Sequence, residues 1–204
     1  MIHEAKYKTL YEAIFRQRNV FLDIAMIALS VVFLALIAKI RIPLWPVPIT
    51  MQTFGVFTIA FFFGSWRGAI TLIGYILAGL VGFAVFAGNK TGLEVFYTIK
   101  EGAAVLGPSA GYIIGFVFAA FAVGWMIEKG YGRNWKSILF VLLVGEILIY
   151  AFGLPWLWLA LPNLTFWQML MAGLIPFIIG DALKMIGAAA LFPYLWKGAE
   201  KIKS

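Results

Sequence analysis

The sequence contains no cysteine and one histidine, His3, and only 12% of its 204 residues are charged. Without cysteine the chain has no disulfide, no thiolate nucleophile and no cysteine-ligated metal. The one histidine stands beside the start methionine, outside any apolar segment, so we expect neither a histidine-based catalytic triad nor a histidine-rich metal site. A phosphate-binding G-x-x-x-x-G-K-[ST] loop is missing too, so we expect no ATP hydrolysis by this chain. These absences favour a protein that is not an enzyme and needs no cofactor.

Hydrophobic residues are abundant, at 63% of the chain. A soluble domain has about 45–50% apolar and about 25% charged residues. A chain of this length cannot bury so much apolar surface in its own core. We therefore expect one integral membrane domain over residues 1–204. The formal charge of +7 is explained by Lys and Arg at the cytoplasmic ends of membrane helices, and we expect no nucleic-acid partner.

Six apolar segments are long enough to cross a bilayer core about 30 Å thick. They cover residues 20–38, 48–64, 69–87, 109–127, 137–152 and 168–196. The first segment follows a short tail, residues 1–19, and lacks the cleavage site of a signal peptide. The sequence thus predicts an all-α membrane protein with six transmembrane helices.

The positive residues are unequally distributed between the two sides of this predicted arrangement. Eleven of the 16 Lys and Arg residues lie on the side of the two termini, four lie on the other side, and Lys184 lies within the sixth segment. Because Lys and Arg accumulate in cytoplasmic loops, we expect both termini in the cytoplasm of a bacterial cell, with the chain in the inner membrane.

Four ionisable residues lie inside the apolar segments. They are Asp23, Glu146, Asp181 and Lys184. Each such residue costs about 2.5–3.5 kcal/mol on insertion scales, and residues of this kind usually have a function. Asp23 is near the cytoplasmic end of its segment, where the first turn of a helix stabilises an anion. Asp181 and Lys184 are three residues apart and so share one helix face.

Two interpretations of the Asp181–Lys184 pair are open. It can be an ion pair that only holds helices together, or a ligand site in which the carboxylate accepts ligand N–H groups and the ammonium meets a ligand oxygen. Glu146 can likewise bridge helices or face the same ligand. If the sixth segment is one continuous helix, Asp181 lies about thirteen residues, or roughly 20 Å, from its start.

Two connections on the outer side differ from simple linkers. Residues 41–53 include three prolines within six residues, which enforce a stiff, extended entry into the second segment. Residues 86–112 form a long, glycine-rich connection. Long loops between membrane segments often act as lids over a cavity.

Five motifs, in this order, resemble the BioY family, the biotin-binding S components of energy-coupling-factor transporters. They are VPITMQT (47–53), GFAVFAG (82–88), LGPSAGY (106–112), IYAFGLPW (149–156) and PFIIGDALK (176–184). The resemblance implies an S-component fold of six membrane helices with biotin bound near the outer surface under loops. It also implies a separate coupling subunit and ATPases as partners.

The resemblance assigns the Asp181–Lys184 pair to the ligand. Biotin, with a ureido ring, an apolar thioether ring and a carboxylate tail, fits a mostly apolar pocket with a few polar groups. Glu146 stands where the family more usually has Asn. Substrate contacts are predicted for seven residues: Asp181, Lys184, Asn89, Tyr112, Glu146, Tyr150 and Gln52.

Other functions have less support in the sequence. Within transport, the alternative is a related vitamin or a biotin precursor carried by the same architecture. An intramembrane enzyme would have to use Asp181 and Glu146 as acid and base without histidine, cysteine or metal-ligand spacing. A channel would need rings of polar residues along several helices, and these segments are too apolar.

Overall fold

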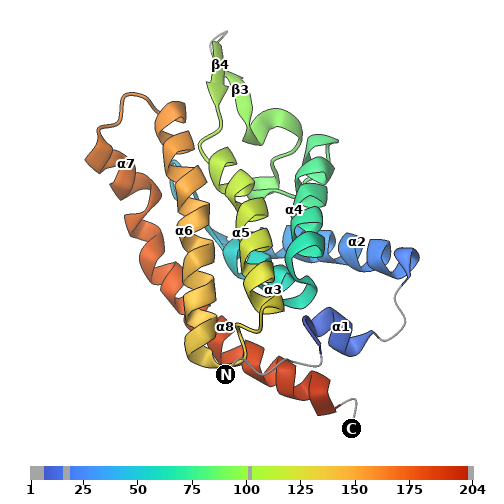
Figure 1. The fold of residues 1–204 in the computed structure, drawn as a ribbon. Helices are drawn as coiled ribbons and strands as arrows, with labels where there is room; N and C mark the ends of the chain where they lie inside the picture. The colour runs from blue at the N-terminus through green and yellow to red at the C-terminus, as the bar shows by residue number, and fades with distance from the viewer. Residues whose placement is uncertain (1–6, 16–18, 101–102, 202–204) are drawn as a thin grey trace.

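The computed structural model describes residues 7–15, 19–100 and 103–201. It is a bundle of helices with two short β-hairpins at one end (Figure 1). The helices are α1 (Leu10–Ile14), α2 (Val20–Ile37), α3 (Gln52–Phe63), α4 (Ser65–Leu80), α5 (Ala110–Glu128), α6 (Trp135–Ala160), α7 (Phe166–Gly173) and α8 (Ile175–Lys201).

The two hairpins are antiparallel and lie in the connections that follow α2 and α4. In the first, β1 (Arg41–Ile42) pairs with β2 (Ile49–Thr50). In the second, β3 (Tyr97–Lys100) pairs with β4 (Ala103–Leu106). Two short 3-10 helices, η1 (Ala87–Asn89) and η2 (Gly92–Val95), lead into the second hairpin. In the residues that the structure describes, both connections that the composition singled out therefore contain secondary structure.

Four helical stretches of the described chain are long and apolar enough to span a membrane. They are Val20–Ile37, Ala110–Glu128, Trp135–Ala160 and Phe166–Ala199, the last of which combines α7 and α8. Helix α3 is apolar but has only 12 residues, and α4 has 16. The protein is thus a helical membrane protein with several candidate spans, and the predicted number of six is not confirmed.

The differences between predicted and observed helix ends have local causes. Residues 48–51 do not begin a helix, because Ile49 and Thr50 are extended and pair with β1. Helix α4 begins at Ser65 rather than 69, where the Glu128 carboxylate accepts hydrogen bonds from the Ser65 backbone N (2.7 Å) and Oγ (2.9 Å). This carboxylate satisfies donors that a helix start otherwise leaves unpaired. Helix α4 also ends at Leu80, seven residues before the predicted end.

Helix α6 runs from Trp135 to Ala160, beyond both predicted ends at 137 and 152. At its start, the Asn134 side chain accepts from the Ser137 backbone N (3.0 Å), an N-cap that fixes the first turn. At its other end, Pro155 lies inside the helix without terminating it. The longer helix carries Trp156 to Gly107, whose carbonyl accepts from the indole N–H (2.9 Å).

The sixth predicted segment is two helices, α7 and α8, separated at Leu174. Pro176 lies in the first turn of α8, where its missing N–H costs no intrahelical hydrogen bond. The break places Asp181 six residues after the start of α8, about 9 Å along its axis. The prediction that Asp181 lies roughly 20 Å into a continuous helix is therefore wrong, and its carboxylate is near the hairpin end.

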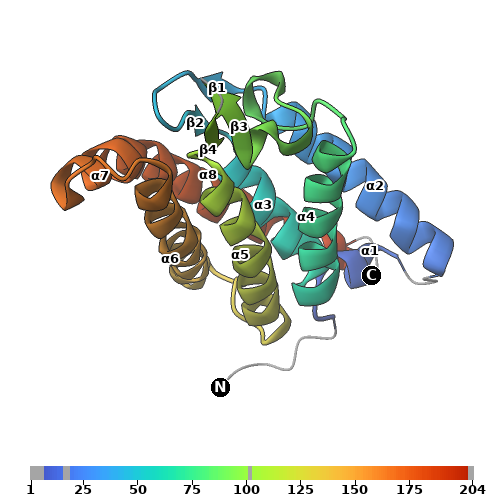
Figure 2. The ribbon, with the colours of Figure 1, turned by 90° about the horizontal axis from the view of Figure 1, so that it is seen from above.

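Helix α5 occupies the centre of the bundle, beside α3, α4 and α6 (Figures 1 and 2). Small residues allow the close approach: a Cβ at Gly111 would be 2.2 Å from the Cβ of Trp156, and one at Gly115 would be 3.0 Å from the Ile149 backbone. Helix α2 instead crosses the outside of α3 and α4, and Leu34 is its one buried residue. Its other apolar side chains suit a lipid environment.

The end of the bundle opposite the hairpins gathers the segments predicted to be cytoplasmic (Figure 1). Arg133, between α5 and α6, donates to the backbone oxygen of Tyr7 (2.7 Å) and lies 3.3 Å from the ring centre of Trp196 in α8. Asp23 lies in the first turn of α2, as expected, and also forms an ion pair with Arg67 of α4 (3.0 Å). These contacts place the first described residues and the last turns of α8 at the same end of the molecule.

Candidate ligand-binding cavity

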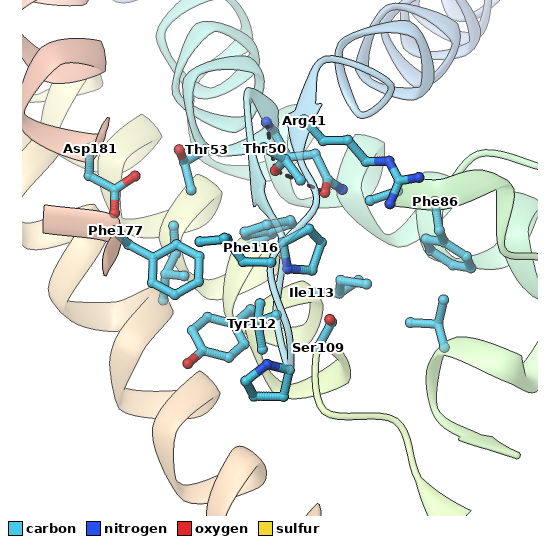
Figure 3. A pocket seen from close by; sticks show the side chains of 18 of the residues that line it. Arg41, Thr50, Thr53, Phe86, Ser109, Tyr112, Ile113, Phe116, Phe177 and Asp181 are labelled. Atoms are coloured by element: carbon cyan, nitrogen blue, oxygen red, sulfur yellow. Dashed lines mark hydrogen bonds between the residues drawn. The ribbon is translucent and has the colours of Figure 1, made fainter. Parts of the chain in front are cut away.

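A cavity of about 240 Å³ lies at the hairpin end of the bundle. It is bounded by the first hairpin, by the connection after α4, and by α3, α5, α6 and α8 (Figure 3). In the close view, Asp181 and Phe177 of α8 lie on one side of the cavity and Arg41 and Phe86 on the other. The cavity therefore collects side chains from segments far apart in the sequence.

The side of the cavity formed by α8 carries a buried ion pair. Lys184 Nζ lies 2.8 Å from Asp181 Oδ1, and both side chains are more than nine-tenths buried. Tyr150 of α6 donates from its hydroxyl to Asp181 Oδ2, and Lys184 also donates to Thr53 Oγ1 of α3 (3.1 Å). The pair thus links three helices and faces the cavity at the same time.

Glu146 of α6 lines the same cavity, one helical turn before Tyr150. The residue is 4% exposed. Neither of its carboxyl oxygens has a hydrogen-bond partner among the residues that the structure describes. A buried polar group without a partner is costly, so these oxygens are open acceptors for a bound ligand.

Gln52, at the start of α3, lines the cavity and is 4% exposed. Its amide accepts from Thr50 Oγ1 (3.1 Å) and donates to the Tyr75 hydroxyl (2.9 Å). That hydroxyl donates in turn to the Val85 carbonyl (2.9 Å). The Gln52 side chain therefore ties the hairpin to the cavity wall next to Phe86.

Tyr112 presents its ring to the cavity, since its hydroxyl donates to the Gly173 carbonyl at the α7–α8 break (2.8 Å). The rings of Tyr150 and Phe177 lie 6.1 Å and 6.4 Å from it, centre to centre. Together with Phe116 these rings give the cavity an apolar, aromatic wall. Asn89, the remaining predicted site residue, is exposed and does not line the cavity.

Two cations at the outer side of the cavity were not predicted as site residues. Arg41 of β1 and Lys90, just after η1, both line it. From the sequence they were visible only as charges on the outer side, because nothing local indicates that residues 41 and 90 converge. Their neighbour Lys39 is engaged elsewhere, donating to the carbonyls of Ala84 (2.5 Å) and Phe86 (3.0 Å).

The cavity therefore has two polar regions separated by apolar walls. One contains Glu146, Asp181 and Lys184, and the other contains Arg41 and Lys90. Such an arrangement suits a small elongated ligand that has hydrogen-bond donors and a carbonyl at one end, an apolar middle and an anionic tail. Mostly apolar sites with a few convergent polar groups are typical of small-molecule binding.

Comparison with known proteins identifies the family to which the chain belongs. A family model described as the BioY family matches residues 12–201. The chain belongs to the BioY family. This confirms the resemblance that the five motifs indicated.

Similar BioY proteins come from both bacteria and archaea. A biotin transporter BioY from Thermotoga maritima is 34% identical over 163 residues, covering 78% of this chain and 89% of that protein. A biotin transporter BioY from Rhizobium etli is 31% identical, covering 82% and 87%. A probable biotin transporter BioY from Pyrococcus horikoshii is 32% identical, covering 83% and 93%.

A solved structure shares the BioY fold described here. The crystal structure of the S-component for biotin from an ECF-type ABC transporter superposes with a TM-score of 0.73 and 27% sequence identity. The match covers 89% of this chain and 95% of that one. Since the BioY relatives and this S component are transport proteins, the prediction that the chain is not an enzyme is confirmed.

Proposed function

We propose that this chain is the biotin-binding S component of an energy-coupling-factor transporter. It takes biotin from outside the cell membrane and works with a separate coupling subunit and ATPases. The observation that carries the proposal is the cavity under the first hairpin, with the Asp181–Lys184 pair and the open Glu146 carboxyl on one side. The biotin transporters among its relatives and the similar biotin S component support the same ligand.

The polarity of the cavity favours one orientation of biotin. The ureido ring lies beside Glu146, Asp181 and Lys184, so that its two N–H groups meet carboxyl oxygens and its carbonyl meets the ammonium. The thioether ring packs against the aromatic wall of Tyr112, Phe116 and Phe177. The carboxylate tail points to Arg41 and Lys90, where a planar guanidinium suits a carboxylate. Polar atoms at both ends then have partners, which gives specificity as well as affinity.

We also propose six membrane crossings, by α2, α3, α4, α5, α6 and the α7–α8 unit. The twelve residues of α3 extend only about 18 Å, which is less than the thickness of the bilayer core. In this arrangement the β1–β2 hairpin, which directly precedes α3, completes that crossing on the outer side. The cations near α1, the α5–α6 connection and the end of α8 support a cytoplasmic position for that end of the bundle.

Topology can be tested with a reporter fused to the C-terminus. An enzyme that is active only outside the cytoplasmic membrane should stay silent there, because six crossings return the chain to the cytoplasm. A cytoplasm-active reporter at the same position is the matched control and should give signal. Activity of the external reporter, with full-length fusion present in the membrane, would contradict the six crossings.

The ligand can be tested by calorimetry on the purified full chain in detergent, without partner or ATP. Biotin should bind, because the whole cavity lies within this chain. Biotin amide, which lacks the carboxylate, should bind more weakly because it forms no ion pair with Arg41 and Lys90. Desthiobiotin and thiamine, as competitors, distinguish biotin from a precursor or another vitamin.

The calorimetry tests the proposal only on protein that has first been shown to be folded and free of bound ligand. No heat and no competition at high micromolar biotin would refute the proposed function. Tighter binding of desthiobiotin or thiamine would keep the S-component role but reassign the ligand.

A further inference from the structure

Glu146 differs from the other buried polar residues of the cavity in having no hydrogen-bond partner within the described part of the chain. Asp181 is engaged by Lys184 and Tyr150, and Gln52 is engaged by Thr50 and Tyr75. Both oxygens of Glu146 lack a hydrogen-bond donor among the described residues, although the residue is only 4% exposed. The described residues around Glu146 therefore leave room for its carboxyl group but donate no hydrogen bond that would stabilise a negative charge on it.

The polar groups that line the cavity together with Glu146 come from several elements. Helix α8 contributes Asp181 and Lys184, which face the same cavity and are paired with each other at 2.8 Å. The other titratable groups that line the cavity are the hydroxyls of Tyr150, on α6 itself, and Tyr112, on α5, and the cations Arg41, on β1, and Lys90, after η1. Helix α3 contributes Gln52 and Thr53 to the cavity lining, which are neutral.

The balance of these charges disfavours an ionised Glu146 in the absence of ligand. The Lys184 ammonium is already matched by the Asp181 carboxylate. The other two cations that line the cavity, Arg41 and Lys90, belong to its second polar region, so a second negative charge beside the pair would be uncompensated. A buried charge without hydrogen bonds is far less stable than the same group in its neutral form. The protonated acid is therefore the form that this site accommodates without ligand.

A ligand with N–H donors changes that balance. Donors that reach the Glu146 oxygens supply the missing hydrogen bonds, and hydrogen bonds to a carboxylate are stronger than those to a neutral acid. Building on the proposed function, we infer that binding of a cyclic urea such as biotin expels the proton of Glu146, so that ligand and proton compete for one carboxyl group. The proton leaves the carboxyl oxygen and passes to water through the cavity mouth.

This competition gives the site a means of release. Binding strengthens as the pH rises, by up to tenfold per pH unit while one proton is released. Reprotonation of Glu146 turns one of its acceptor oxygens into a donor and weakens the hydrogen bonds from the ligand N–H groups, and so favours dissociation. Glu146 thereby links occupancy of the cavity to the proton concentration on the side to which the cavity opens.

Calorimetry in several buffers tests the inference. Biotin is titrated into the full chain in detergent at one pH near 7, in buffers with different enthalpies of ionisation. The observed enthalpy should vary linearly with the ionisation enthalpy of the buffer. The slope of that line gives the number of protons released per biotin, and we expect a value between about 0.5 and 1. The carboxyl tail of biotin does not contribute, because ordinary carboxylic acids are already ionised at that pH.

Two variants identify the source of the proton. Glu146→Gln, which is nearly isosteric, should abolish the slope. Glu94→Gln is the matched control: the residue is exposed in η2 and does not line the cavity, so the wild-type slope should remain. A Glu146→Gln protein that keeps the slope would overturn the inference.

Infrared difference spectroscopy on wild-type protein gives a readout that does not depend on the variant folding. With glutamate carrying a ¹³C-labelled side-chain carboxyl, biotin should remove the carbonyl stretch of a protonated acid and produce carboxylate bands. Biotin binding with no proton release, with proton uptake, or with a persistent acid band overturns the proton linkage. Absence of any binding heat would instead refute the proposed function.

Discussion

Asp181→Asn and Lys184→Met are each expected to weaken biotin binding by at least about tenfold. Either change leaves the partner group buried and uncompensated, which at buried sites costs about 2–5 kcal/mol. Each 1.4 kcal/mol corresponds to a tenfold change in affinity. The pair is more than nine-tenths buried, with 2.8 Å between Nζ and Oδ1, so solvent does little to compensate the loss. Calorimetry with biotin on each purified variant measures the effect.

A purely structural pair would give a different pattern. The pair already connects α8 to Tyr150 of α6 and to Thr53 of α3, so a loss of stability is compatible with both interpretations. In the structural case, each single variant melts at a lower temperature, the double variant Asp181→Asn/Lys184→Met recovers part of the loss, and biotin affinity of the folded fraction hardly changes. Thermal melting and affinity measured on the same three samples separate the two interpretations.

The ion pair between Arg67 and Asp23 is the matched control. It lies at the opposite end of the bundle, and its side chains are 31% and 27% exposed. Ion pairs exposed to this degree contribute about 0–1 kcal/mol, so Asp23→Asn and Arg67→Met should leave biotin affinity unchanged. If the Asp181 and Lys184 variants also bind like the parent, the pair does not contact the ligand. The contacts would then have to come from Glu146, Tyr112 and the cations Arg41 and Lys90.

Helix positions follow closely from hydropathy where a helix is bounded by polar residues or a clear cap. Residues 20–38 and 109–127 were predicted, and α2 and α5 run from Val20 to Ile37 and from Ala110 to Glu128. The prediction fails where an apolar stretch is not helical throughout. Ile49 is apolar but pairs in a strand, and Leu174 is apolar but interrupts a helix. Hydropathy registers the affinity of a side chain for lipid, not the backbone conformation.

The part of the candidate site that consists of charged residues within apolar segments could be predicted from the sequence. Glu146, Asp181 and Lys184 were identified because charges in apolar segments are rare, and the structure brings them to one cavity. The partners of Tyr112 and Gln52 were not predictable, since each bonds to a residue far along the chain, Gly173 and Tyr75. Arg41 and Lys90 were missed for the same reason: an exposed cation in a short connecting strand or a loop has no sequence feature that distinguishes a cavity wall from an ordinary surface.

Gly124→Ala is expected to destabilise the protein strongly. Gly124 lies on α5, where a Cβ would be 2.2 Å from the Gly64 carbonyl carbon and 2.4 Å from the Ser65 backbone nitrogen. These obstacles are backbone atoms, and Gly64 is held at a φ of 81° in the one-residue connection between α3 and α4. The turn cannot yield as a flexible side chain would, so α5 and α4 must separate.

The separation has a second cost, because Glu128 lies one turn further along α5. Its carboxylate accepts from the Ser65 backbone N at 2.7 Å and so caps α4. Overpacking costs about 1–3 kcal/mol, and loss of a cap adds about 1 kcal/mol. For a domain of this size about 3 kcal/mol lowers the melting temperature by about 6–12 °C. Thermal melting in detergent, followed by the fraction that remains monodisperse, measures the change.

Gly187→Ala is the matched control. Gly187 lies within α8, and beyond the adjoining backbone of its own helix no heavy atom of the described residues lies within 4 Å of the position that an alanine methyl group would take, so the same substitution meets open space. Since alanine is the better helix former, this variant should melt at the parent temperature or slightly above it. Equal melting of the Gly124→Ala variant and the parent would show that the turn at Gly64 relaxes freely. Because Gly124 lies at the end of the bundle opposite the cavity, the fraction of Gly124→Ala that remains folded should bind biotin with the parent affinity.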